Sequence, residues 1–167
     1  MTRTRRIVTG HAADGRSVIV EDGPVPHTRT LPGAIFDEVW ATDAAPAPLG
    51  PMPAGEPTTA SPAIGPGHPG GTIVRIIDFL PLSAGGVRSP MHRTRTIDYG
   101  VVVEGEVTLI LSDSETTLRK GDVVVQRGTD HAWENRSTGT ATMVFVLIDA
   151  AFDPALAGMI DQQAIMQ

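Results

Sequence analysis

Three side chains in one stretch of this 167-residue chain have the types and spacing needed for chemistry. His92 lies six residues before Asp98, and His131 comes from a separate segment. Two imidazoles and one carboxylate that converge on one point form a ligand set suited to a divalent metal with open positions. The same groups can instead transfer protons without a metal, with His131 or Asp98 as the acid or base.

These side chains can meet only if the backbone bends between His92 and Asp98. Residues two apart in a strand share a face, so His92 and Thr94 point the same way. Six residues of extended chain would separate His92 from Asp98 by about 20 Å. We therefore expect a bend at Arg95–Ile97 and a turn immediately before His131.

Short strands must position these groups. From Gly86 to Asn135 apolar and polar residues alternate, and turn residues interrupt the pattern at short intervals, which is typical of all-β sandwiches and barrels. The predicted fold class is therefore all-β. The predicted strands are 72–80, 101–103, 107–111, 123–125 and 142–148, with turns at 112–114 and 120–122.

The flanking segments complete a single domain. Residues 1–71 hold three β-like runs (6–9, 17–20 and 34–41), which we expect to join the edge of the barrel or a partner subunit. Asp43–Gly71 contains eight of the fourteen prolines, so it cannot be a central strand; a surface loop is the favoured interpretation and a lid the alternative. After a barrel at 72–150, the tail 151–167 is predicted to hold one short helix over Asp153–Gln163, with Asp153 as N-cap.

The spacing around the first histidine resembles the first signature motif of the cupin superfamily. That motif is Gly, five residues, His-x-His, three or four residues, Glu, six residues, Gly. This chain has, at those points, Gly86, His92, Thr94, Asp98 and Gly105. Two positions depart from the motif, because Thr94 replaces the second histidine and Asp98 is one methylene shorter than glutamate.

The second cupin motif, Gly, then Pro-x-Gly, two residues, His, three residues, Asn, has a similar counterpart. Its positions correspond to Gly121, Gln126, Gly128, His131 and Asn135. Gln126 replaces the proline, and the gap after Gly121 is one residue short. The resemblance covers about residues 72–149 and does not extend to the N-terminal portion.

The resemblance implies a double-stranded β-helix, which is a small jelly-roll barrel, with N-terminal edge strands. It also implies that His92, Asp98 and His131 hold a divalent ion such as Fe, Mn, Ni or Zn. The hydroxyl of Thr94 is a poor ligand, but a site with three protein ligands and water is chemically sound. A barrel that works without metal, as an acid/base site or a binding pocket, is the alternative.

Further residues are candidates for a substrate pocket. Trp133 shares a face with His131 and is interpreted either as a pocket wall or as core, while Thr94 and Gln126 flank the site. Arg75 interrupts an apolar strand; a solvated position at an edge is favoured over one that faces an anionic ligand. The remaining histidines, His11, His27 and His68, are predicted to be hydrogen-bonded core or surface residues and not ligands.

Composition limits the classes of partner. A formal net charge of −6 without a basic face argues against nucleic acid, and the absence of cysteine excludes disulfides and thiolate metal sites. No apolar run approaches the roughly 18 residues of a membrane span, and the polar start does not fit a secretory signal, so no membrane partner and a cytoplasmic location are expected. A homodimer is the expected assembly, because closed two-fold association is the commonest kind.

The resemblance to cupins implies a metal-dependent lyase or isomerase that decarboxylates, dehydrates or cyclises a small oxygenated metabolite. An Fe(II) dioxygenase is the second hypothesis, since two histidines and a carboxylate also suit that ion. A non-catalytic small-molecule-binding barrel is the third.

Overall fold

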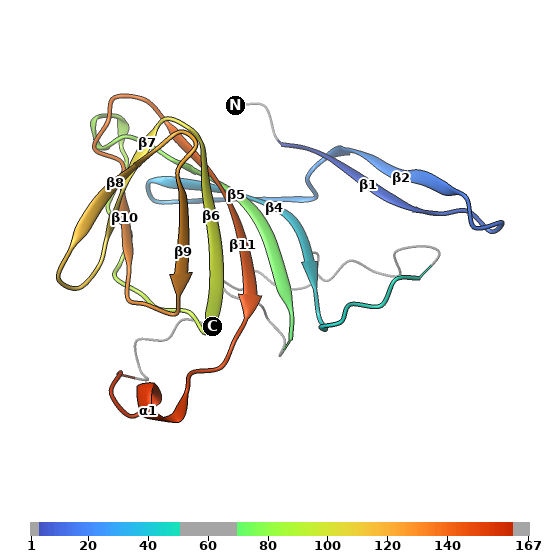
Figure 1. Cartoon of the computed structure of the whole chain (residues 1–167). Helices are drawn as coiled ribbons and strands as arrows, with labels where there is room; N and C mark the ends of the chain where they lie inside the picture. The colour runs from blue at the N-terminus through green and yellow to red at the C-terminus, as the bar shows by residue number, and fades with distance from the viewer. Residues whose placement is uncertain (1–3, 51–69, 162–167) are drawn as a thin grey trace.

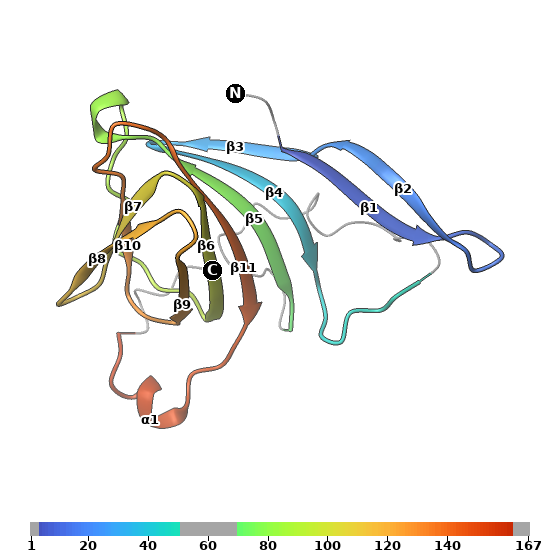
Figure 2. The same ribbon diagram turned by 45° about the horizontal axis from the view of Figure 1, so that its top comes forward.

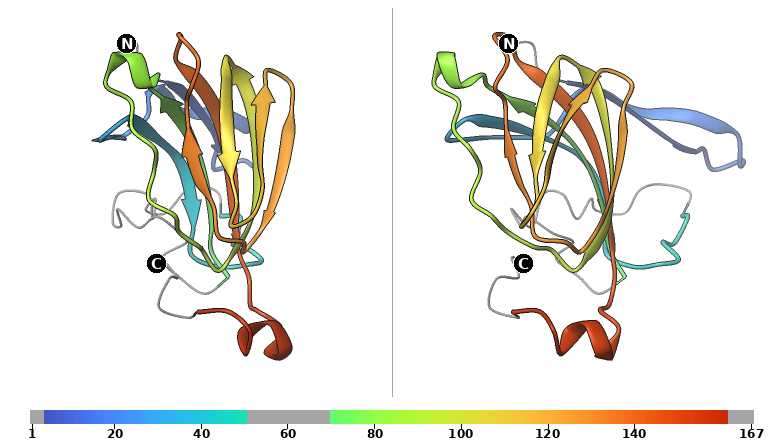
Figure 3. Two further views of the ribbon diagram at one scale, coloured as in Figure 1. Left: turned by 90° about the vertical axis from the view of Figure 1, so that its left-hand side faces the viewer. Right: turned by 60° about the vertical axis from the view of Figure 1, so that its left-hand side comes forward.

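The computed structural model describes residues 4–50 and 70–161. A six-stranded sheet with the order β3-β4-β5-β11-β6-β9 faces a three-stranded sheet with the order β10-β7-β8 (Figures 1 and 3). A separate hairpin, β1-β2, projects away from them (Figure 2). The strands are β1 Arg5–His11, β2 Ser17–Pro24, β3 His27–Leu31, β4 Ala34–Thr42, β5 Thr72–Phe79, β6 Thr96–Glu104, β7 Glu106–Ile110, β8 Glu115–Arg119, β9 Val123–Arg127, β10 Ala132–Glu134 and β11 Ala141–Asp149.

The predicted all-β barrel is confirmed, and its core follows from alternation along the central strands. Every second side chain of β5 and β11 is buried, and the two strands pair antiparallel along their whole length. The Trp133 ring of the opposite sheet lies 5.8 Å from the Phe79 ring and 5.6 Å from the Phe145 ring, between centroids. Burial of each such apolar side chain stabilises the fold by about 1.5–3 kcal/mol.

The N-terminal strands extend this barrel. β4 pairs with β5, and β3 pairs with β4 outside it, so β5 has neighbours on both sides. The sequence did not predict β3, because His27–Leu31 carries only one apolar side chain. The β1-β2 hairpin is anchored at its base by Arg6, which donates to the carbonyl oxygen of Val39 at 3.1 Å and pairs with Glu21.

The outer face of the six-stranded sheet is apolar where β6 and β9 meet. Tyr99, Val103, Val123 and Val125 are exposed there, and Tyr99 faces away from Asp98 as alternation requires. A two-stranded hairpin such as β1-β2 is at best marginally stable alone in water. The homodimer remains a prediction, with this face and the hairpin as the surfaces that a second copy would cover.

For the segments around the barrel, the structure tests the sequence-based predictions only in part. Residues 43–50 form no helix or strand, and 51–69 lie outside the described residues, so the loop or lid remains a prediction. The helix α1, Pro154–Ala157, begins as predicted, because Asp153 Oδ1 accepts from the Ala155 N–H at 2.9 Å. It was predicted too long: Gly158 ends it after one turn, since glycine disfavours helix. In the part of the chain that the structure describes, no helix is long and apolar enough to cross a membrane.

The glycine that opens the first motif holds a tight turn after the 3₁₀ helix η2, Leu82–Ala84. The Gly86 N–H donates to the carbonyl oxygen of Pro81 at 2.9 Å, and a Cβ on Gly86 would lie 2.0 Å from the carbonyl oxygen of Leu80. Backbone surrounds this position, so no flexible side chain can move aside.

We predict that Gly86→Ala lowers the free energy of unfolding by about 2 kcal/mol or more, because the turn must open to admit the methyl group. Gly139→Ala is the control, since nothing lies within 4 Å of its Cβ position, and a change below about 0.5 kcal/mol is expected. Urea unfolding of both variants measures the difference. Equal midpoints for the two variants would show that the turn is not constrained.

Candidate active site

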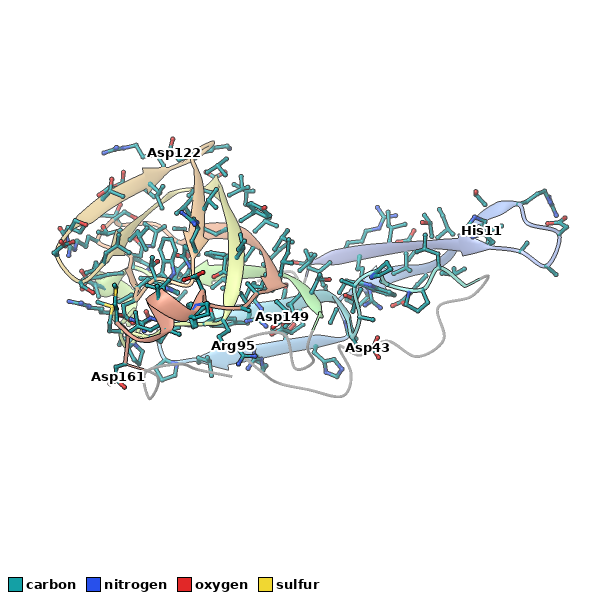
Figure 4. The ribbon with its side chains drawn as sticks, turned by 60° about the horizontal axis from the view of Figure 1, so that its bottom comes forward. His11, Asp43, Arg95, Asp122, Asp149 and Asp161 are labelled. Carbon is teal, nitrogen blue, oxygen red and sulfur yellow. The ribbon has the colours of Figure 1, made fainter. Side chains whose placement is uncertain are left out.

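A cavity of about 460 Å³ lies within the barrel and opens to solvent. Its volume falls in the range of small-molecule pockets, roughly 300–1,000 Å³. Every residue that the sequence singled out for a site lines it: His92, Thr94, Arg75, Asp98, Gln126, His131 and Trp133. The apolar wall consists mainly of Phe36, Ile77, Phe79, Phe145 and Leu147. His11, by contrast, lies on the projecting hairpin (Figure 4).

A short backbone bridge brings the two histidines together. The N–H of His92 donates to the carbonyl oxygen of His131 and the reverse bond also forms, both at 2.9 Å. The ring centroids are consequently 4.2 Å apart. The chain then bends at Arg95 and enters β6, which carries Asp98 into the same cavity, so the predicted bend is present.

Both imidazoles are oriented by backbone carbonyls. His131 Nδ1 lies 2.9 Å from the carbonyl oxygen of Thr129, and His92 Nδ1 lies 2.9 Å from that of Pro90. A carbonyl oxygen can only accept, so Nδ1 carries the hydrogen, and in the neutral ring Nε2 presents a lone pair. Burial, reinforced by the charge of His92, lowers the pKa of His131 to about 4, so this ring is neutral at pH 7.

Gln126 joins the carboxylate to an imidazole. Its Nε2 donates to Asp98 Oδ2 at 3.0 Å and lies 3.3 Å from His131 Nε2. Burial raises the pKa of Asp98, while hydrogen bonds from Thr96 and Gln126 and the charges of Arg75 and His92 oppose that shift. Asp98 Oδ1 and Gln126 Oε1 are buried without a hydrogen-bond partner. These two oxygens therefore lack hydrogen-bond partners in the protein, and almost none of their surface is accessible.

The types of ligand atom in the cavity suit a divalent ion, but their arrangement suits one only in part. Two imidazole nitrogens and an unpartnered carboxylate oxygen are the ligand types that such ions take. Among residues 4–50 and 70–161, however, no three His, Asp or Glu side chains are grouped so that they could hold a metal. The amide of Gln126 stands between Asp98 and His131, so the carboxylate reaches an ion beside the imidazoles only if this amide turns away.

Two motif positions have structural roles. Thr94 Oγ1 shares a hydrogen bond of 2.7 Å with Thr96 Oγ1, so the hydroxyl in place of the second histidine is occupied within the protein. Asn135 is buried; its Nδ2 donates to the carbonyl oxygens of Phe79 and Gly139, both at 2.8 Å, and its Oδ1 accepts from Ser137. Asn135 therefore links the end of β5 to the turn before β11.

The sequence-based preference for a solvated position of Arg75 was wrong. It is 2% exposed, and its Nε donates to Glu38 Oε2 at 3.2 Å, while Glu38 Oε1 accepts from Arg29 at 2.6 Å. Because β4 and β3 continue the sheet past β5, the inward residues of β5 point into the barrel. Sequence reasoning missed Glu38 and Arg29; the one available signal was a charged pair inside the apolar run 34–41.

Trp133 combines the two roles proposed for it. It belongs to the buried core and also lines the cavity, with its ring edge-on to the His131 ring at 6.4 Å between centroids. It therefore forms the apolar wall behind the imidazole.

Comparison with known proteins identifies the family of the chain. A family model described as "Cupin domain" matches residues 80–147. A "Cupin-domain-containing oxidoreductase fogC" of Aspergillus ruber is 39% identical over 158 residues, which is 89% of this chain and 74% of that protein. "Phomopsin biosynthesis cluster protein C'" of Diaporthe leptostromiformis is 52% identical over 84 residues, which is 49% of this chain. The chain spans only 42% of that relative's length.

Among solved structures, the Cnp3 cupin domain of Schizosaccharomyces pombe matches with a TM-score of 0.53 and 10% identity. The match covers 97% of this chain and 99% of the other. At that identity the match concerns the fold alone.

The buried neutral imidazole predicts how stability depends on pH. The folded His131 has a pKa of about 4 against about 6.5 when unfolded, so between these values only the unfolded chain takes up this proton. The free energy of unfolding should therefore fall as pH decreases from 6.5 to 4, by about 3 kcal/mol in total from this group. Asp98 acts in the opposite sense, because its raised pKa favours the folded state at low pH and that contribution is lost as pH rises.

His131→Gln isolates this contribution, since Asp98 is present in both proteins. Denaturant unfolding at a series of pH values should give a shallower decline for the variant between pH 6.5 and 4. Parallel curves would mean that His131 titrates normally in the folded protein.

Proposed function

Because the chain belongs to the cupin superfamily, we propose that it is an enzyme that transfers protons on a small, largely apolar metabolite held inside the barrel. The observation that carries the proposal is the neutral His131, whose Nε2 is linked through the Gln126 amide to the buried carboxyl group of Asp98 in a cavity of small-molecule size. The name of the Aspergillus ruber relative, an oxidoreductase, favours an enzyme over a binding protein. The class of reaction is our proposal.

In this mechanism His131 is the base. Nε2 accepts a proton from a carbon or hydroxyl of the substrate, and the Nδ1–H bond to the carbonyl oxygen of Thr129 stabilises the resulting imidazolium. Asp98 is the acid, because its raised pKa favours a protonated carboxyl that can donate to a substrate oxygen. Removal of a C–H proton with protonation of the carbonyl oxygen gives an enol. Removal of a C–H proton with protonation and departure of a hydroxyl on the neighbouring carbon gives an alkene and water.

Gln126 would position the substrate. Its amide bridges Asp98 and His131 in the ligand-free structure, and a substrate oxygen can take over one of these two hydrogen bonds. The aromatic walls formed by Phe79, Trp133 and Phe145 exclude water, which strengthens each polar contact inside the cavity.

A divalent ion is a second proposal, supported by the two Nδ1–carbonyl bonds, which leave the Nε2 lone pair of His92 for coordination, and that of His131 once the Gln126 amide has turned away. His92 and His131 would hold it, with Asp98 as third ligand once the Gln126 amide has turned. Such an ion would polarise a substrate oxygen or, as Fe(II), support oxygenase chemistry.

Proton transfer predicts solvent-deuterium exchange into carbon acids. We expect the wild type to exchange the α-hydrogens of at least one compound in a panel of aryl 2-oxo acids, β-keto acids and neutral 1,3-diketones, followed by proton NMR. His131→Gln should slow the exchange about 100-fold or more, because the base is lost. His11→Gln, on the exposed hairpin, is the matched control and should exchange at the wild-type rate.

Equal rates for His131→Gln and the wild type would contradict the assignment of the base. If the panel compounds raise the melting temperature of the wild type but none exchanges, the barrel is a binding protein and the enzyme proposal fails.

The metal proposal predicts about one equivalent of Fe, Mn, Ni or Zn in protein purified from metal-replete culture, measured by elemental analysis. His92→Ala and His131→Ala should lose the ion, because each removes one nitrogen ligand, while His11→Gln should retain it. A wild type without stoichiometric metal, whose melting temperature no added ion raises, would contradict this proposal.

A further inference from the structure

Two exposed apolar side chains form part of the rim of the cavity. Leu31 at the end of β3 is 40% exposed, and Val87 in the segment before His92 is 49% exposed. Of the large apolar side chains that are exposed in the described part of the chain, these two alone line the cavity. A single exposed leucine needs no explanation, but exposed apolar surface gathered at the mouth of a pocket is typical of a ligand-binding groove.

Backbone contacts hold both parts of this rim in place. A Cβ on Gly33 would lie 2.5 Å from the backbone nitrogen of Val87, so the turn between β3 and β4 touches the segment of Val87. The carbonyl oxygen of Gly33 accepts from the N–H of Leu80 at 2.9 Å. The Ser89 N–H donates to the carbonyl oxygen of Trp133 at 2.9 Å, and the Trp133 N–H donates to Ser89 Oγ at 2.8 Å. A rim that is already ordered loses little entropy when a ligand binds, so apolar contacts there contribute more fully to affinity.

The size of the cavity relates the rim to the reacting groups. Val87 precedes His92 by five residues, so the rim lies at most about 17 Å from this histidine along the chain. At about 30 Å³ for each water-sized group, the volume of about 460 Å³ corresponds to roughly 15 non-hydrogen atoms. A much smaller compound held at the imidazoles would leave the rim uncovered, whereas one with an apolar tail would reach it.

We propose that Leu31 and Val87 determine substrate specificity by binding an apolar tail of the substrate at the mouth of the barrel. The substrate class is then an oxygenated compound whose polar end lies at His92 and His131 and whose alkyl or aryl-alkyl tail ends at the rim. This inference rests on the proposed function, because the same cavity holds the reacting groups. Contact between the tail and the two side chains removes apolar surface of both from water, which favours binding.

The test varies the length of the tail and keeps the polar end constant. Isothermal titration calorimetry measures binding of two neutral 1,3-diketones, 2,4-hexanedione and 2,4-undecanedione, to the wild type. A buried methylene group strengthens binding about fourfold, so the longer diketone should bind at least about 30-fold more tightly. Leu31→Ser and Val87→Ser should each weaken binding of the longer diketone about fivefold and leave the shorter one unchanged. Val103→Ser is the matched control, because Val103 is 39% exposed on β6 but lies outside the cavity, and it should change neither affinity.

Equal affinity of the wild type for the two diketones would overturn the inference, and this comparison does not depend on the folding of any variant. Unchanged binding of 2,4-undecanedione in both rim variants would also overturn it, as would an equal loss in Val103→Ser, because the tail would then bind outside the cavity. The two proposals can fail separately. Preference for the longer diketone without any deuterium exchange would refute the enzyme and keep the rim site, whereas exchange of both diketones with equal affinities would do the reverse.

Discussion

The site depends on two backbone hydrogen bonds between His92 and His131. They join the segment before β6 to the segment before β10, and they place two imidazoles side by side although 39 positions separate them in the sequence. Each ring is then oriented by a carbonyl two residues earlier in its own chain segment. The orientation of each imidazole is thus local, and only their meeting needs the barrel.

Burial determines the acid–base chemistry of His131 and Asp98. It lowers the pKa of His131 and raises that of Asp98, so both groups are driven toward their neutral forms at the same point of the cavity. A neutral imidazole can accept a proton, and a protonated carboxyl can donate one, which is the pairing that the proposed acid–base function uses. Arg29 on β3 and Arg75 on β5 both donate to the carboxylate of Glu38 on β4.

Much of the fold could be predicted from the sequence, in those segments where residue spacing alone indicates the structure. The alternating strands β5 and β11 and the turns at 112–114 and 120–122 follow from local pattern. Only residues 101–103 of β6 were predicted as strand, and the bend after His92 was inferred from the need to bring His92 and Asp98 together. Prediction failed where a neighbouring strand decided the outcome. β3 is too polar to be recognised alone, and without β3 and β4 the strand of Arg75 resembles an edge, so this buried arginine was assigned to solvent. Helix α1 was overextended, because the sequence pattern did not give enough weight to Gly158.

By itself the sequence determined the resemblance to cupins, the all-β barrel and part of the cavity lining, including His92, Asp98 and His131, because motif spacing and two-residue alternation are properties of a chain segment. Only the tertiary structure decided that the Gln126 amide separates the carboxylate from the imidazole, and that Arg29, Glu38 and Arg75 form one charged wall. These contacts join strands that pair across the sheet. Their distances depend on sheet order and register, which are fixed only when the whole barrel closes around its core.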